Sequence, residues 1–476
     1  MTSSHGSSFS SGLLGLAQVL FSLVFSLNPA ASAPSPANEA TRELLIVTPE
    51  MFVSALKPFV DHKHKRLPTR VQLLETILAR SEGIDDPERL KRFLYDAWHD
   101  GSLGYVLLVG DVDLVPVRYM VLDRITPAAF DYAFYPSDLY YSDLARKDGS
   151  FDDWNAQKEA FHAAYFGEVR GEKNKDGSIN FDRIDYLPDV AVGRWPVSTL
   201  NELHRVVEKT IAYETTLSQT PSSPPLAAFF AVGGWVDSRP LMHRLAGSLT
   251  NNWQIEARFY SDPASGIDTP PPDHRELRAL LNRGVSLVVH TGHGQADAWE
   301  QCFSLKDLNA ITNAATLPVF ISAGCSTACF APLPPYEAYV DVHGKEHAGT
   351  DNREVFTEPP PPPAAYQRGP FNPTGLGEQI LKRDLNGGVA YVGCNTGSQP
   401  CALTLLEGFV ESLATHPRPR LGDCWVAAIR HYYNRERLAN LKPTRDWYPP
   451  SIFFQGMKFM VFGDPSLEMP GRCASE

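Results

Sequence analysis

The sequence predicts an α/β protein in which two α/β halves form a sandwich around a parallel sheet. The first observation is a set of short, apolar, β-branched runs that stop at glycine, such as 285–290 and 317–322. Such runs are typical of strands that are buried on both faces. These runs also alternate with segments of helical periodicity, which predicts βαβ units. With 476 residues and 43% hydrophobic content, the chain is long enough for one large domain or two to three ordinary ones.

The first half is expected at residues 43–217. Its predicted strands are 43–48, 71–74, 105–109 and 190–193, and its predicted helices are 52–64, 87–100 and 201–217. Pro87 stands just inside the start of the second helix and Gly101 at its end, which is the usual asymmetry of helix ends. Ser198 or Thr199 is expected near the N-cap of the third helix. Together these elements predict a small α/β unit.

The second half is expected at residues 226–470, after a Ser/Pro-rich linker at 218–225. Its predicted strands are 227–232, 257–260, 285–290, 317–322, 388–393 and 457–462, and its predicted helices are 241–252, 274–282, 377–384, 402–414 and 423–437. The proline-rich stretch 331–373 is too irregular for core. Because it follows Cys325 closely, it is either a lid or specificity loop, or a surface insertion.

Residues 1–33 resemble a cleaved signal peptide. The apolar run from Leu13 to Leu27 is shorter than the roughly 20 residues of a spanning helix. Ala31-Ser32-Ala33 then resembles a signal-peptidase site. The alternative is an uncleaved anchor, and membrane association is expected only in that case. The expected location is secreted, periplasmic or at the cell surface.

The net charge of −12 argues against nucleic acid or an anionic membrane surface as the main partner. The seven cysteines are compatible with export. If one serves as a free nucleophile, the other six are enough for three disulfides, and several free buried thiols are the alternative. Because paired Cys-x-x-Cys motifs do not occur, the spacing does not predict a zinc site.

Two of the predicted strands end next to reactive side chains. Residues 285–290 lead to His293 between two glycines, and residues 317–322 lead to Cys325. In open α/β sheets the site lies beyond the carboxyl ends of the strands. A thiol becomes a strong nucleophile when a nearby histidine takes its proton or stabilises its charge. Each residue alone has an ordinary structural explanation, but their matched positions favour a Cys/His nucleophilic site.

Neighbouring residues compete for these roles. His290 lies inside its strand and is expected to be packed, so His293 is preferred as the exposed catalytic ring. Cys329 lies one helical turn after Cys325 and is either a disulfide partner or a residue without a role in the site. Cys325 is preferred as the nucleophile because it stands directly at the strand end. The backbone N–H groups of Gly294 and Cys325 are the natural oxyanion donors.

The segments 288–299 and 317–325 resemble the catalytic segment of the gingipain family of cysteine peptidases. The family's Thr-Gly-His-Gly histidine falls on His293, and its nucleophile falls on Cys325. The similarity spans roughly 43–469 and includes three further segments: 105–111, 189–194 and 462–467. The resemblance implies a caspase-like α/β fold and peptidase activity.

One departure from the family pattern concerns the acid that supports the histidine in gingipains. Here the corresponding strand ends at Val232-Gly233-Gly234-Trp235, and the first acid is Asp237. Asp297 follows His293 by four residues but is expected to be exposed. We therefore expect a Cys/His dyad.

The aromatic and acidic segment 138–182 contains a partial match to a calcium loop. Glu172, Asn174 and Asp176 place oxygen side chains at alternating positions, and Asp182 follows at the end of the segment. Arg183 stands where a bidentate glutamate is expected. The alternatives are a structural calcium ion or a solvated acidic turn. The gingipain resemblance favours calcium, and the peptidase chemistry itself requires no cofactor.

Candidate walls of a substrate pocket are Trp299, Asp237 and the segment from Asn395 to Gln399. An aspartate in the pocket would favour Arg or Lys at the cleaved bond. The pocket segment 393–400 lacks the expected aromatic residue, so this specificity is not transferred from the family.

The combined expectation is an exported cysteine endopeptidase that acts on a protein or peptide. Two alternatives stay open: a caspase-like module that binds without hydrolysis, and a transpeptidase that uses the same Cys/His pair.

Overall fold

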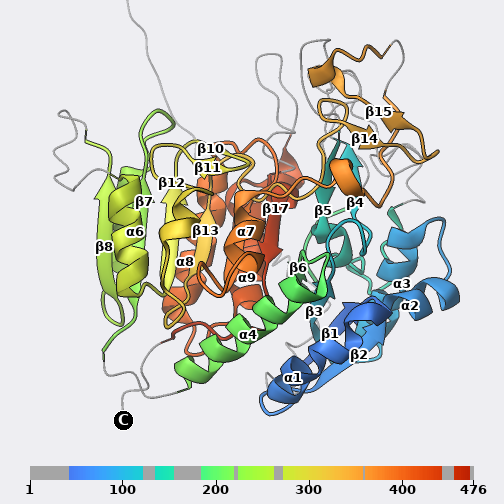
Figure 1. Ribbon diagram of the computed structural model, residues 1–476. Helices are drawn as coiled ribbons and strands as arrows, with labels where there is room; N and C mark the ends of the chain where they lie inside the picture. The colour runs from blue at the N-terminus through green and yellow to red at the C-terminus, as the bar shows by residue number, and fades with distance from the viewer. Residues whose placement is uncertain are drawn as a thin grey trace, which may run out of the picture. The chain divides into compact units, whose positions relative to one another are not determined.

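One mixed sheet runs through the computed structural model (Figure 1) and joins segments from both halves of the chain. The structure describes residues 42–121, 134–154, 184–218, 223–261, 272–356, 360–441 and 455–471. The strand order of the ten-stranded sheet is β2-β1-β3-β6-β17-β16-β13-β9-β7-β8. Its strands are β1 (Glu43–Thr48), β2 (Thr69–Leu73), β3 (Leu103–Val109), β6 (Ala191–Trp195), β7 (Leu226–Ala231), β8 (Gln254–Phe259), β9 (Leu287–Thr291), β13 (Val319–Ser322), β16 (Ala390–Cys394) and β17 (Phe459–Phe462).

All pairings in this sheet are parallel except that of β17 with β16. The strands β2, β1, β3 and β6 come from the first half, and the other six come from the second. The two sets meet where β17 pairs with β6 at Phe462 and Arg194. Residues 40–476 form one compact unit, so the expected boundary at 218–225 separates two halves of a single sheet.

Nine α-helices are described, and they cover both faces of the sheet. They are α1 (Val53–Lys63), α2 (Leu74–Arg80), α3 (Asp86–His99), α4 (Leu200–Leu217), α5 (Arg239–Leu249), α6 (His274–Arg283), α7 (Leu376–Lys382), α8 (Ala402–Thr415) and α9 (Leu421–Arg435). In Figure 1, α1, α4, α6 and α7 lie in front of the sheet and α8 and α9 behind it. Among the described helices, α4 packs on α1 and α7, and α8 packs on α5 and α9. None of the helices in the described ranges has the length and apolar character of a membrane span.

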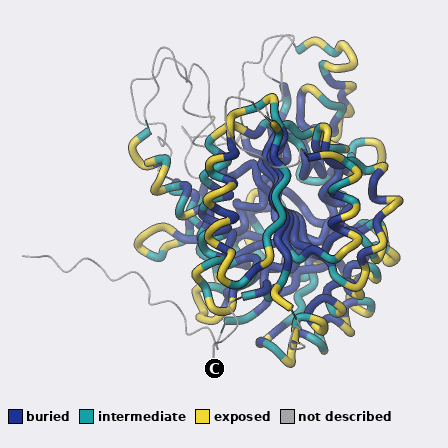
Figure 2. Tube along the Cα trace, turned by 90° about the vertical axis from the view of Figure 1, so that its left-hand side faces the viewer, coloured by how far each residue is buried: buried dark blue, intermediate teal, exposed yellow. Residues whose placement is uncertain are grey.

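The core consists of the strands and the inner faces of these helices. Every residue of β3, β7, β9, β13 and β16 is buried. Figure 2 shows this buried interior, with exposed residues on the outer sides of the flanking helices. Strands covered on both faces are mostly apolar, which is why the runs are visible in the sequence.

The predicted helices and buried strands are confirmed to within a few residues, but several small elements were missed. These are α2, the hairpin β4 (Arg118–Val121) with β5 (Phe134–Ser137), the three strands β10 (Gly294–Gln295), β11 (Ala298–Trp299) and β12 (Phe303–Ser304), and the pair β14 (Tyr339–Val340) with β15 (Glu346–His347). Strands of two to four residues have too little periodicity to stand out in a sequence.

The proline-rich stretch 331–373 packs on the first half. The N–H of Phe134, which begins β5, donates to the carbonyl of Pro334 at 3.0 Å, and the N–H of Val117 donates to that of Ala365 at 3.0 Å. The Tyr366 hydroxyl also donates to Asp86 at 3.0 Å. In the described residues the stretch is therefore attached to the β4–β5 hairpin and α3.

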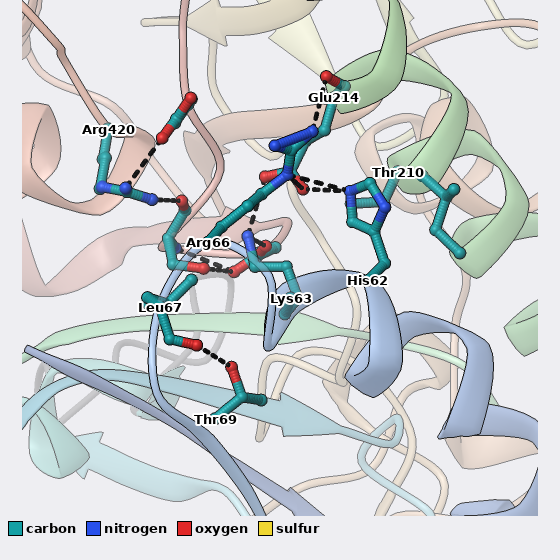
Figure 3. A network of polar contacts seen from close by, with 12 residues as sticks. His62, Lys63, Arg66, Leu67, Thr69, Thr210, Glu214 and Arg420 are labelled. Carbon is teal, nitrogen blue, oxygen red and sulfur yellow. Dashed lines mark hydrogen bonds and ion pairs between the residues drawn. The ribbon is translucent and has the colours of Figure 1, made fainter. Parts of the chain in front are cut away.

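A buried ion network ties the two halves together (Figure 3). Lys63 at the end of α1 is fully buried, and its Nζ lies 2.8 Å from Glu214 on α4 and 2.8 Å from Asp464 after β17. His62 and Arg66 add contacts to Glu214 at 2.8 and 3.3 Å. Burial by itself raises the pKa of Glu214, but the Lys63 charge and the hydrogen bonds outweigh it, and the pKa is lowered to about 2.

The polar residues of the other gingipain-like segments also serve the fold. Arg194 on β6 is buried and forms a bidentate pair with Asp138 at 2.7 and 2.8 Å. Asp111 accepts from Lys382 on α7 at 3.1 Å. Buried charges need such partners because desolvation is costly.

Candidate active site

The candidate nucleophile and base follow neighbouring strands at the same edge of the sheet. β9 and β13 are parallel, and His290 lies opposite Ser322 in their register. Because the two strands end level with each other, the loop that carries His293 and the loop that carries Cys325 leave the sheet side by side. This is the arrangement expected of a site beyond the carboxyl ends of parallel strands.

Cys325 is half-buried and carries a free thiol. The N–H of Ser398 donates to its Sγ at 3.3 Å, and the thiol in turn points to the carbonyl of Ser398 at 3.6 Å. Ser326 has a φ of +56°, a left-handed conformation that is uncommon outside glycine, and its N–H donates to the carbonyl of Thr396 at 2.8 Å. A sharp turn directly after the cysteine therefore joins its loop to the loop that follows β16.

His293 is held by a backbone carbonyl. Its Nε2 lies 2.7 Å from the carbonyl oxygen of Gly234, in the loop after β7. A carbonyl only accepts hydrogen bonds, so Nε2 carries the hydrogen and Nδ1 has the free lone pair. Gly234 has a φ of +92°, and a Cβ added there would lie 3.5 Å from the imidazole. The loop after β7 thus fixes the tautomer of the ring without an acid.

Gly294 lies against the backbone of Cys325. A Cβ added to Gly294 would come within 3.1 Å of the Cys325 nitrogen and 2.7 Å of its carbonyl oxygen. Only glycine fits such a close approach between two backbone segments. Within the described ranges, the N–H of Cys325 has no hydrogen-bond acceptor.

His290 lies in the core, away from solvent. It is fully buried, stacks on Trp299 with parallel rings 4.2 Å apart, and its Nδ1 lies 2.9 Å from the Ser322 hydroxyl. Burial lowers the pKa of His290 to about 3, so the ring stays neutral. This is the packed role expected for it.

The described cysteines form no disulfide. The six of them, Cys302, Cys325, Cys329, Cys394, Cys401 and Cys424, are free, while Cys473 lies outside the described residues. Cys329 is buried, and burial raises the pKa of its thiol well above the ordinary value. Of the two interpretations of the cysteines, free thiols hold for this part of the chain, since a well-packed core does not need crosslinks.

Two of the expected pocket residues, Trp299 and Asn395, are fully buried and present no surface to a substrate in this structure. Trp299 has no exposed surface, and its Nε1 donates to the Tyr391 hydroxyl at 2.9 Å. Asn395 also has no exposed surface, and its Nδ2 donates to the carbonyl of Pro136 at 2.6 Å. Both lie close to the site in sequence but face the interior.

The other two expected pocket residues reach solvent. Asp237 accepts from Arg239 at 2.8 and 3.0 Å and from the Tyr260 hydroxyl at 3.0 Å. These hydrogen bonds lower the pKa of Asp237 to about 2, and the side-chain hydrogen bond from Arg239 has the largest effect. Its charge is therefore already matched by a guanidinium. Gln399 is exposed, and its N–H donates to the Gln455 side chain at 3.1 Å.

The expected calcium ligands Glu172, Asn174, Asp176 and Asp182 lie outside the described residues. No group of three or more His, Cys, Asp or Glu side chains in the described ranges is placed to hold a metal ion. The adjoining segment nevertheless has an excess of buried acid. Asp143 is fully buried, neither of its carboxylate oxygens has a hydrogen-bond partner among described residues, and burial raises its pKa well above the ordinary value.

Sequence reasoning missed the groups that hold the two reactive side chains. The carbonyl of Gly234 and the N–H of Ser398 are backbone groups, which every residue except proline offers. The only sequence signal was the Gly233-Gly234 pair at the end of β7, which allows a close approach.

Most of the chain matches a known family of peptidases. The model of Peptidase family C25 matches residues 37–470. Gingipain R2 of Porphyromonas gingivalis is 24% identical over 322 residues, which are 64% of this chain and 36% of that protein. Gingipain R1 of the same organism is 24% identical over 304 residues, which are 60% of this chain and 25% of that protein. The chain thus spans about a third or less of these relatives.

Two solved structures have a similar fold. The crystal structure of the Arg-specific cysteine proteinase gingipain R has a TM-score of 0.58 at 18% identity and covers 92% of this chain and 80% of that one. The complex of RgpB pro- and mature domains from Porphyromonas gingivalis has a TM-score of 0.56 at 17% identity and covers 90% and 79%. The expected caspase-like α/β fold is confirmed.

Proposed function

The chain belongs to peptidase family C25, and we propose that it is a cysteine endopeptidase that hydrolyses protein or peptide substrates. The observation that carries the proposal is the side-by-side exit of the His293 and Cys325 loops from β9 and β13. Cys325 is the nucleophile, His293 is the general base and acid, and backbone N–H groups hold the oxyanion.

In the first step the Cys325 sulfur attacks the scissile carbonyl carbon, and the thiol proton passes to Nδ1 of His293. The carbonyl oxygen takes up the electron pair as an oxyanion. The N–H of Cys325, which has no acceptor among described residues, and the N–H of Gly294 are the proposed donors to it. When the intermediate collapses, the C–N bond breaks and the amine leaves with the proton from His293.

In the second step water attacks the thioester carbon. His293 takes a proton from the water, the C–S bond breaks, and the acid product leaves as the thiol regains its proton. The Gly234 carbonyl supports His293 throughout, because it holds the ring orientation and stabilises the imidazolium. This contact takes the role that an acid has in many triads, so a Cys/His dyad with a backbone anchor is sufficient.

Substrate binding is proposed for the exposed residues beside the site. Gln399 directly follows Ser398, whose N–H contacts the Cys325 sulfur. The exposed side-chain amide of Gln399 is therefore available to a bound peptide. Asp237 is also exposed, but Arg239 already balances its charge. Asp237 is therefore not proposed as the source of a preference for Arg or Lys at the cleaved bond.

Two further features are proposed on other grounds. Export follows from the signal-like residues 1–33, and cleavage after Ala33 is checked by sequencing the mature N-terminus. A structural calcium ion is proposed for the acidic segment 138–182. The carboxylate oxygens of Asp143, which have no hydrogen-bond partner among the residues that the structure describes, have the hard-donor chemistry that calcium prefers. If calcium binds there, a chelator should lower the unfolding temperature, and added Ca²⁺ should restore it. Differential scanning calorimetry measures both changes.

The test compares Cys325→Ala with Cys329→Ala as the matched control. Both thiols are on the same loop, but only that of Cys325 reaches solvent. We expect iodoacetamide to label Cys325 and a peptide library to be cleaved by the mature protein and by Cys329→Ala. Cleavage by Cys325→Ala would refute the proposal. Retained peptide binding without any cleavage would indicate a binding module, and an amine-trapped product would indicate a transpeptidase.

A further inference from the structure

Lys458 is a buried cation near the candidate nucleophile. It directly precedes β17, is 3% exposed, and forms no ion pair with any carboxylate in the described ranges. Its Nζ lies 3.5 Å from the carbonyl oxygen of Gly397. A desolvated ammonium without a carboxylate partner is costly to the fold, so its position calls for a functional explanation.

The carbonyl that Lys458 contacts belongs to the peptide group that contacts the sulfur. The C=O of Gly397 and the N–H of Ser398 are the two ends of one planar peptide unit. That N–H donates to Cys325 Sγ at 3.3 Å. A continuous polar path therefore runs from the ammonium through one peptide group to the sulfur.

We propose that Lys458 is a positioning residue that stabilises the thiolate form of Cys325 through the Gly397–Ser398 peptide group. The inference rests on the proposed function, in which this thiolate is the nucleophile. The ammonium orients and polarises the peptide group, which makes its N–H a stronger donor to a negatively charged sulfur. A donor aimed at the charged form favours that form.

The size of the effect follows from the length of the path. The two contacts, 3.5 and 3.3 Å, and a peptide group about 2.3 Å across put the ammonium at most about 9 Å from the sulfur. In a medium with an effective dielectric constant of about 20, a unit charge at that distance shifts the thiolate equilibrium by about twentyfold. Because Lys458 and Ser398 are buried, salt screens this end of the interaction weakly.

Among the described residues, the other titratable groups facing Lys458 are the thiols of Cys394 and Cys401 and the ring of Tyr135, whose centroid is 6.0 Å away. Burial raises the pKa of Cys394 to about 12 and that of Cys401 to about 11, so both stay neutral near pH 7. Burial has the largest effect on the pKa of Lys458 and lowers it. The nearby Cys394, Cys401 and Cys325 oppose this effect in part.

The backbone of the Ser398 loop has anchors that do not depend on the Lys458 side chain. The N–H of Asn395 donates to the carbonyl of Lys458 at 2.8 Å, and the N–H of Ser326 donates to that of Thr396 at 2.8 Å. Changing the side chain leaves both bonds in place. Replacing a buried charge by a hydrophobic side chain of similar volume is often neutral or stabilising, so Lys458→Met is expected to fold.

The experiment measures the rate of iodoacetamide alkylation at Cys325 from pH 5 to 9, read by mass spectrometry of its peptide. In Lys458→Met we expect a rate about twentyfold lower on the acidic side of the profile and an equal rate at the alkaline plateau. Lys458→Gln keeps a donor for the Gly397 carbonyl but has no charge, and we expect the same shift. Lys458→Arg keeps the charge, so its alkylation rate is expected to stay within about threefold of the wild-type rate across the profile.

The matched control is Lys91→Met, which removes another fully buried lysine. Lys91 is on α3, which packs on β3, and three strands separate β3 from β13, the strand that leads to Cys325. This variant should leave the profile unchanged. An unchanged profile in Lys458→Met or Lys458→Gln would overturn the inference, and the glutamine variant gives the answer if the methionine variant does not fold. If the wild type cleaves no peptide but the profile shifts, the proposed function fails, while the effect of Lys458 on the Cys325 thiolate is supported.

Discussion

At the scale of single residues, the site depends on close backbone contacts more than on side-chain identity. The imidazole of His293 is bound by the Gly234 carbonyl, and the sulfur of Cys325 by the Ser398 N–H. Both contacts are made by loops that follow other strands, β7 and β16. The two reactive residues could be predicted because the thiol and the imidazole are distinctive side chains. Their partners could not be predicted, because they are backbone groups that nearly every residue has.

Gly294→Ala is expected to lower kcat/KM by about 10²- to 10³-fold, the usual cost of a lost oxyanion donor. The added Cβ would meet the Cys325 backbone nitrogen at 3.1 Å and its oxygen at 2.7 Å, and backbone atoms cannot move aside cheaply. Steady-state kinetics on a cleaved peptide check this. As the control, Gly247→Ala on α5 has no atom within 4 Å of its Cβ and should keep full activity. Full activity in Gly294→Ala would contradict the proposed geometry.

At the scale of elements, α7 joins the site loops to the rest of the fold. At its start, the N–H of Leu376 donates to the carbonyl of Ala296 at 2.7 Å, and the N–H of Gly377 donates to that of Thr327 at 3.0 Å. Those carbonyls belong to the loops that carry His293 and Cys325. The first turn of this short helix therefore fixes both loops, while Lys209 on α4 caps its other end.

Lys209→Met is expected to lower the free energy of unfolding by about 3 kcal/mol, because buried carbonyls lose their donor. The Nζ of Lys209 donates to the carbonyls of Ile380, Leu381 and Asn386 at 2.8 to 2.9 Å. Urea unfolding followed by circular dichroism measures the loss. His204→Ala, on the exposed side of the same helix, should change stability by no more than about 0.5 kcal/mol. Equal effects from the two variants would rule out this capping role.

At the scale of the whole molecule, ion pairs connect the two halves where the sheet has least pairing. β17 and β6 share one paired position, Phe462 with Arg194. The network of Lys63, Glu214 and Asp464 joins α1, α4 and the segment after β17. The two halves therefore rely on side-chain charges as well as on strand pairing.

Lys63→Met is expected to cost about 3–5 kcal/mol of stability, since two buried carboxylates lose their shared cation. The matched control is Lys57→Met on the same helix, whose side chain is 74% exposed and pairs only with exposed Asp61 in the part of the chain described. That change should cost at most about 0.5 kcal/mol. Chemical denaturation compares the two. A small loss in Lys63→Met would show that the network contributes little to the union of the halves.

The same network predicts acid sensitivity. Glu214 has a pKa of about 2 in the fold against an ordinary 4.5, so the folded state favours the carboxylate. The stability from this group is present above about pH 4.5 and is lost as the pH falls toward 2, by at most about 1.4 kcal/mol per pH unit. Unfolding temperatures between pH 2 and 7 check this. Glu214→Gln should show a flatter dependence in that window, and an unaltered slope would be the contrary result.

The fold class, the buried strands and the two reactive residues could be predicted from the sequence alone. The buried strands were visible because strands covered on both faces are mostly apolar, and Cys325 and His293 were visible because they stand where such strands end. The tertiary structure alone decided the surroundings of those residues. Trp299 and Asn395 turned inward, and Asp237 was matched by Arg239. Lys458, just before β17 and more than a hundred residues from Cys325 in the chain, reached the peptide group that contacts the sulfur. The physical reason is that sequence periodicity reports how deeply a segment is buried, whereas contacts between loops depend on strand order and on backbone groups common to nearly all residues.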